Sequence, residues 1–161
     1  MFREDYALTY YLDKTDILTE LAVVVEGKQT ERGGSGTHKG KGPKYIAITR
    51  PRRFGKTVMA NMIVSYFGKG VDSHAEFDTL KVAKQPWYKN HLNQHNVIYI
   101  PFHETPDEIT DYNHYINRIK SLLLDDLAMA YPDIRIRENE AVWDVLKKIY
   151  EYSGGEKFIF V

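Results

Sequence analysis

The chain has 161 residues, 43% hydrophobic and 13% aromatic, enough to bury one ordinary core, so we expect residues 1–161 to form a single domain or part of one. Its 22 basic and 22 acidic residues give a formal net charge of +0, which excludes a global field that attracts nucleic acid or an anionic membrane. The absence of cysteine excludes disulfides and thiol catalysis, and the chain has neither an apolar signal core nor a bilayer-length apolar run, so a cytoplasmic protein is expected.

The first predicted elements are an extended segment and a helix. Ala7–Leu12 is predicted as a short strand or an extended lead-in, and Asp13 as the cap of a helix that begins at Lys14 and ends near Gly27. The apolar face of this helix consists of Ile17, Leu18, Leu21, Val24 and Val25. Nearby tyrosines fit an adenine pocket or, more commonly for aromatic side chains, the core; they are Tyr6, Tyr10 and Tyr11.

The segment Gly27–Lys44 has the composition of a flexible loop, with glycines and polar residues and no apolar period. Because it is basic, an alternative is a segment that becomes ordered on a phosphate or nucleic-acid partner. No Gly-Lys pair within it is followed by Ser or Thr, and no amphipathic helix begins there. A surface loop is therefore the favoured interpretation.

A strand, a basic turn and a helix are predicted in succession between Tyr45 and Phe67. Tyr45–Thr49 is a short apolar run that predicts a buried strand. From Lys56 onward the apolar period becomes helical, until Gly68 ends the helix. Its apolar face consists of Val58, Met59, Met62, Ile63, Tyr66 and Phe67. This succession is the context that a phosphate-binding loop requires.

The loop itself carries the residues that phosphate chemistry needs. Backbone N–H groups at a helix N-terminus hold polyphosphate, and Gly55 lets the backbone approach it. Lys56 is predicted to reach the outer phosphates, and the Thr57 hydroxyl to ligate Mg²⁺. The candidate cofactor-binding residues are Arg50, Pro51, Arg52, Arg53, Phe54, Gly55, Lys56, Thr57 and Val58. The alternative is an ordinary turn with a solvated lysine.

One position departs from the pattern G-x-x-x-x-G-K-[ST], because Arg50 stands where the first glycine is expected. Arginine does not readily adopt positive φ, so the first bend must be made differently, with Pro51 as the residue that could set φ. The neighbouring arginines, Arg52 and Arg53, fit three roles: a phosphate clamp, an ion pair with an acidic partner, or a solvated turn.

The next predicted elements lead to a second strand. Asp72–Ala83 predicts a short helix, and Trp87–Leu92 a further helical turn. Val97–Phe102 is a near-continuous apolar run, typical of an interior strand in a parallel sheet. Glu104 follows that strand at the edge where such sheets bind ligands, and is a candidate catalytic carboxylate. A solvated residue leaving the sheet fits Glu104 better.

Two amphipathic helices and a last strand complete the chain. The helices are predicted at Asp111–Ala130 and Asn139–Tyr152, and both read as scaffold. Phe158–Val161 has the pattern of a buried strand. The histidines lack the spacing of a metal cluster, so no metal site made by protein ligands alone is predicted.

Four segments together resemble a known family, the AAA-ATPase-like domain. They are ITRPRRFGKT at Ile48–Thr57, YLDKT at Tyr11–Thr15, the segment Phe77–Val82, and NVIYIPF at Asn96–Phe102. The resemblance implies a P-loop NTPase fold with ATP as the nucleotide, and arginine at the first-glycine position is normal there. In many bacterial members this domain precedes a PD-(D/E)XK nuclease-like domain. The strand Phe158–Val161 leads in that family into the acidic Walker B residues, so we expect the chain to be an N-terminal part of the ATPase.

The expected fold is α/β and P-loop NTPase-like, with a mostly parallel sheet and helices on both faces. Its strands are expected at Tyr45–Thr49, Val97–Phe102 and Phe158–Val161. The expected function is binding of ATP with Mg²⁺ and, in the full-length protein, hydrolysis that drives a conformational change. Two alternatives remain open. One is a non-enzymatic nucleotide-sensing or scaffold module, and the other is a nucleic-acid-contacting module associated with a nuclease-like partner domain.

Overall fold

The structure, a computed structural model, describes residues 2–7, 11–27, 44–49, 51–102, 111–137 and 139–161. The chain divides into two compact units, residues 1–97 together with Val161, and residues 98–160. The predictions made for Arg50, for Glu104 and for nearly all of the loop Gly27–Lys44 lie outside the described residues.

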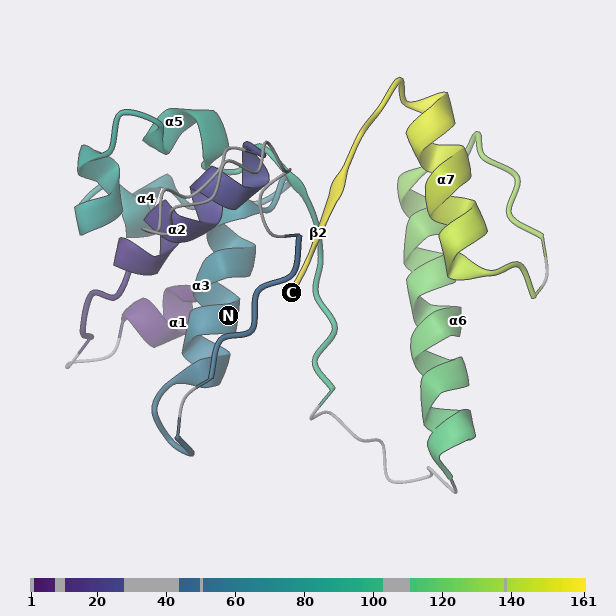
Figure 1. Cartoon of the computed structure of the whole chain (residues 1–161), viewed down its shortest axis with the longest axis horizontal. Helices are drawn as coiled ribbons and strands as arrows, with labels where there is room; N and C mark the ends of the chain where they lie inside the picture. The colour runs from purple at the N-terminus through teal and green to yellow at the C-terminus, as the bar shows by residue number, and fades with distance from the viewer. Residues whose placement is uncertain (1, 8–10, 28–43, 50, 103–110, 138) are drawn as a thin grey trace, which may run out of the picture. The chain divides into compact units, whose positions relative to one another are not determined.

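The first unit is built from helices (Figure 1). They are α1 (Phe2–Tyr6), α2 (Asp16–Val25), α3 (Lys56–Phe67), α4 (His74–Phe77), the 3₁₀ helix η1 (Lys81–Lys84) and α5 (Tyr88–His91). The predicted helices after Asp13 and from Lys56 are confirmed, while Asp72–Ala83 divides into α4 and η1. Helix α1 ends immediately before the stretch Ala7–Leu12, which is predicted as a short strand or an extended lead-in and of which residues 8–10 lie outside the described residues.

Helix α3 carries the aromatic and methionine side chains of this unit's core. Its apolar face is buried as predicted, apart from the half-buried Val58. The Tyr66 hydroxyl donates a 2.9 Å hydrogen bond to the Tyr88 carbonyl, and burial raises the pKa of Tyr66. Gly68 ends the helix as predicted, and a Cβ there would lie 2.6 Å from the Val64 carbonyl oxygen. Only glycine fits this close approach.

A hydrogen-bonded clasp fastens the start of α2 to η1. Asp13 was predicted to cap α2, but Thr15 occupies the N-cap position. Asp13 Oδ1 accepts from the Thr15 N–H at 2.9 Å and from its hydroxyl at 2.7 Å, while Oδ2 accepts from the Lys81 N–H at 2.8 Å. Thr15 Oγ1, fully buried, accepts from the Val82 N–H at 3.2 Å. Asp13 thus joins two elements, because its two oxygens can serve different donors.

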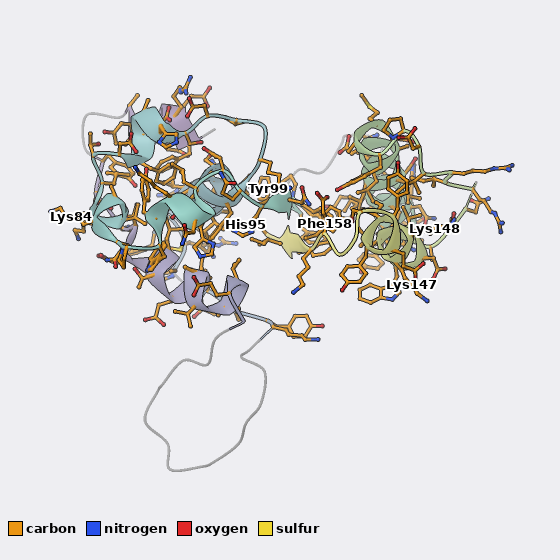
Figure 2. The ribbon with its side chains drawn as sticks, turned by 90° about the horizontal axis from the view of Figure 1, so that it is seen from above. Lys84, His95, Tyr99, Lys147, Lys148 and Phe158 are labelled. Carbon is orange, nitrogen blue, oxygen red and sulfur yellow. The ribbon has the colours of Figure 1, made fainter. Side chains whose placement is uncertain are left out.

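The second unit is a helical hairpin followed by a strand. It contains α6 (Tyr112–Ala130), α7 (Val142–Tyr152) and β2 (Phe158–Phe160), with α6 and α7 side by side (Figure 1). Asp111 caps α6 by accepting from the His114 N–H at 2.9 Å. Phe158 packs against the core of this unit, and Lys147 and Lys148 project from α7 (Figure 2). The buried core residues are Leu127, Ile134, Val145 and Ile149.

Both predicted scaffold helices are confirmed, with different degrees of burial. On α7, Val145 and Ile149 are fully buried. The sequence pattern of α6 predicts a broad apolar stripe, made up of Tyr112, Ile116, Ile119, Leu122, Leu123 and Leu127. This stripe is wrong for Tyr112 and Leu122, which are exposed. In the part of α6 that the structure describes, only Leu127 is fully buried, because α7 covers one end of the stripe.

The sheet within the described residues is smaller than predicted. β1 (Asn96–Ile98) and β2 form a two-stranded parallel sheet, so the predicted strand at Val97–Phe102 is shorter. The predicted buried strand at Tyr45–Thr49 is wrong: the segment has no regular structure, and Tyr45 is 93% exposed. The physical reason is that a strand requires a partner, and within the described ranges β1 and β2 pair only with each other. This mixture of helices and a parallel sheet is compatible with an α/β fold.

Among the described residues, no helix combines the length and the apolar composition needed to cross a bilayer.

Candidate phosphate-binding loop

Two residues of the turn before α3, Arg53 and Gly55, have left-handed backbone. The Phe54 N–H points to the Pro51 carbonyl at 3.4 Å, which closes a turn. Arg53 has φ 66°, and Gly55, the N-cap of α3, has φ 73° and ψ 34°. Glycine adopts this conformation without steric cost, whereas arginine does so rarely. The sequence motif predicts a glycine turn at Gly55, but it gives no signal for the backbone of Arg53.

The first turn of α3 presents N–H donors that have no acceptor within the helix. The Met59 N–H bonds the Gly55 carbonyl at 3.0 Å and is the first bond of the helical pattern. The N–H groups of Lys56, Thr57 and Val58 precede that bond and have no acceptor within the helix. No side chain of the residues that the structure describes caps the helix, and its first turn contains no acidic residue. The partial positive charge of this terminus is therefore available to an anion.

The side chains around these donors face solvent. Exposed positions are Pro51, Arg52, Arg53, Phe54, Lys56 and Thr57, whereas Gly55 and Val58 are half-buried. Lys56 and Thr57 are the first two residues of the helix, so their side chains lie beside the amide donors. Arg50 lies outside the described residues.

This donor set fits the phosphates of a nucleotide with a divalent cation. Backbone amides, an ammonium group and guanidinium groups all donate to phosphate oxygens. The Thr57 hydroxyl is a hard oxygen ligand of the kind that Mg²⁺ accepts beside phosphates. A carboxylate in the first turn would repel a triphosphate, and α3 has none there.

The tyrosines considered for an adenine pocket lie in an aromatic cluster. The rings of Tyr6 and Tyr11 are 5.3 Å apart, and that of Tyr11 is 5.8 Å from Phe2. Tyr11 donates to Met62 Sδ at 3.9 Å, and burial raises its pKa to about 12. These contacts agree with the core interpretation. Tyr10 lies outside the described residues.

A group of hydrogen-bonded histidines was not anticipated from the sequence. His91 Nδ1 lies 2.9 Å from His95 Nε2, and His91 Nε2 lies 3.3 Å from Glu26 Oε1. The ring of Phe67 contacts both imidazoles edge-on. The four-residue spacing of the histidines was the available signal, but Glu26 is far away in the sequence. In the part of the chain that the structure describes, no group of three or more His, Cys, Asp or Glu could hold a metal ion.

Comparison with protein families identifies the chain. The model of the AAA-ATPase-like family, described as predicted AAA-ATPase, matches residues 39–161, which is more than half of the chain. The chain therefore belongs to the predicted AAA-ATPase family, and the family resemblance of the sequence is confirmed at that level. Comparisons with curated proteins and with solved structures gave no match. Membership indicates a predicted ATPase domain that binds nucleotide.

Proposed function

We propose that this chain binds ATP with Mg²⁺ through Arg50–Val58 and that the complete protein hydrolyses the nucleotide. The observation that supports the proposal most directly is the backbone of Gly55. Its left-handed conformation places it at the N-cap of a 12-residue helix that begins with Lys56 and Thr57. A phosphate-binding loop requires such a junction of glycine turn and helix.

Each group of the loop has a distinct role in this proposal. The first-turn N–H groups of α3 bind phosphate oxygens, and Lys56 adds a compact charge for the outer phosphates. The Thr57 hydroxyl holds the cation, which supplies neutralisation of phosphate charge when bound. Arg52 and Arg53, both exposed, supply further N–H donors for phosphate oxygens. In the complete protein, hydrolysis further requires a carboxylate that orients water, and Glu104 is one candidate for it.

The first test is Lys56→Ala, measured as the affinity for Mg-ATP by calorimetry. We expect a loss of about 1 to 3 kcal/mol in binding free energy, as for a charge-assisted hydrogen bond. Lys84→Ala is the matched control, because Lys84 is also exposed and lies in the same unit, on η1. It removes the same charge and should bind as the unaltered chain does. Equal affinity in Lys56→Ala and the unaltered chain would contradict the role of Lys56.

A further inference from the structure

Helix α1 is fastened to α3, the helix that carries the candidate loop. Asp5 Oδ2 accepts a 2.9 Å hydrogen bond from Asn61 Nδ2 on α3. Figure 1 shows α1 alongside α3. The two residues are 56 positions apart in the sequence, so this bond joins distant parts of the chain.

Helix α1 is itself firmly anchored on its other side. Phe2 is fully buried, and its ring stacks on Phe77 of α4 with centroids 4.9 Å apart and planes at 18°. Arg3 forms an ion pair with Glu76 of α4, a carboxylate that is only 5% exposed. Because these contacts hold α1 on α4, the position of Asp5 is fixed, and its hydrogen bond to Asn61 can restrain α3.

Asn61 is a polar residue on the buried face of α3. Asn61 is only 8% exposed, and its neighbours Met62 and Ile63 are also buried but apolar. Its Oδ1 atom is buried and has no hydrogen-bond partner among the described residues. An unpaired buried amide oxygen lowers stability, so core packing alone would favour an apolar residue here. An asparagine at this position can donate the hydrogen bond to Asp5, which an apolar residue cannot.

The position of Asn61 connects this bond to the candidate loop. Asn61 follows Thr57 by four residues, so the two lie on one face of α3, about 6 Å apart along its axis. A hydrogen bond at Asn61 resists rotation of α3 about that axis. Such a rotation would turn the first-turn N–H groups, and the side chains of Lys56 and Thr57, away from a bound phosphate.

We propose that Asp5 and Asn61 are positioning residues for phosphate binding, through which α1 holds the first turn of α3 in its receptive orientation. The inference rests on the proposed binding of ATP. It adds an N-terminal element, outside the residues matched by the family, to the nucleotide site.

The test measures Mg-ATP affinity by calorimetry for Asp5→Ala, Asn61→Leu and the double variant, under conditions where circular dichroism shows each to be folded. Leucine is similar in size to asparagine and leaves no unpaired amide. We expect each single variant to bind Mg-ATP at least about 5-fold more weakly than the unaltered chain. This factor is the lower end of the range typical of coupling between sites. The double variant should be no weaker than either, because one bond is lost in all three. Asp5→Asn keeps an acceptor for Asn61 and should retain the affinity of the unaltered chain.

Each outcome decides between the possibilities. Unchanged affinity in Asp5→Ala and Asn61→Leu, with Lys56→Ala weakened, would overturn this inference and leave the proposed function standing. A loss that only follows the fraction unfolded, with no rescue by Asp5→Asn, would assign both residues to stability and also overturn it. No binding of Mg-ATP by the unaltered chain would overturn the inference together with the proposed function.

Discussion

At the scale of single residues, the backbone of Arg53 is the least expected feature of the candidate loop. An L-residue other than glycine at φ 66° carries a steric cost of about 1 to 2 kcal/mol. Such conformations persist where the surrounding structure requires them, often in ligand clamps. A phosphate clamp would give this arginine a reason to remain in place of glycine.

Substitution of Arg53 separates the backbone from the guanidinium group. We expect Arg53→Gly to be about 1 kcal/mol more stable than Arg53→Ala in chemical denaturation, because alanine keeps the left-handed strain. Both variants lack the guanidinium group, so both should lose Mg-ATP affinity equally if Arg53 is a clamp. Equal stability of the two variants would show that Arg53 does not hold a positive φ in solution.

His95 makes the stability of the first unit depend on pH. Burial, the neighbouring His91 and the charge of Lys69 lower the pKa of His95. Glu26 faces His91 from the opposite side, and the two imidazoles are too close for both to be charged. The unfolded chain therefore takes up this proton at a higher pH than the folded chain does. Stability is present above the unfolded pKa and is lost as pH falls through the lowered folded pKa.

Chemical denaturation at a series of pH values tests this dependence. The free energy of unfolding should decline as the pH falls below about 6.5, with a slope of at most about 1.4 kcal/mol per pH unit for one proton. His95→Gln should remove most of this slope. His114→Gln is the control, because His114 is exposed near the start of α6 in the other unit. A slope that survives in His95→Gln would place the titrating group elsewhere.

At the scale of elements, the clasp of Asp13 and Thr15 shows how a short motif can serve structure. Burial opposes ionisation of Asp13, but hydrogen bonds from Thr15 and Lys81 outweigh it and lower its pKa. The buried Thr15 hydroxyl both donates to Asp13 and accepts from Val82. The start of α2 and η1 are thus joined both through the Thr15 hydroxyl and through the Asp13 carboxylate.

Thr15→Val tests the clasp, since valine has nearly the shape of threonine without its hydroxyl. We expect a loss of about 2 kcal/mol or more in the free energy of unfolding, because a buried N–H of Val82 is left unpaired. Thr15→Ser retains the hydroxyl and should lose only about 1 kcal/mol, as for one buried methyl group. Denaturant titration of the three proteins provides the comparison, and equal losses would argue against the hydrogen bonds.

The sequence predicts helices better than strands in this chain, for a physical reason. Helices α3, α6 and α7 are predicted from the spacing of apolar residues and from the residues that end a helix. These signals are local, because each helical hydrogen bond joins residues only four positions apart. Tyr45–Thr49 has a strand-like composition, but a strand requires a distant partner, which local composition does not contain. The candidate site divides in the same way. A local motif predicts Gly55, Lys56 and Thr57. The hydrogen bond between Asp5 and Asn61 joins residues that are far apart in the sequence, so no local pattern predicts it.

At the scale of the whole molecule, the candidate loop belongs to one of two units. Residues 51–58 lie in the first unit, whose core includes the apolar face of α3. The second unit has a separate core between α6 and α7. The family match spans residues of both units, so the family relationship does not show which unit a nucleotide stabilises. The position of the loop predicts that it is the first.

Amide hydrogen exchange with and without Mg-ATP tests that prediction. A ligand at about 100 times its dissociation constant stabilises what it binds by about 2.7 kcal/mol, equivalent to about 100-fold slower exchange through opening. We expect this slowing in peptides that contain α3, whose first-turn donors we propose as the phosphate ligands, and little change in peptides from α7. Lys56→Ala should remove the slowing in α3 at the same nucleotide concentration. Equal slowing in α7 would mean that the two units open together, and that a nucleotide bound at Gly55 acts on the molecule as one cooperative body.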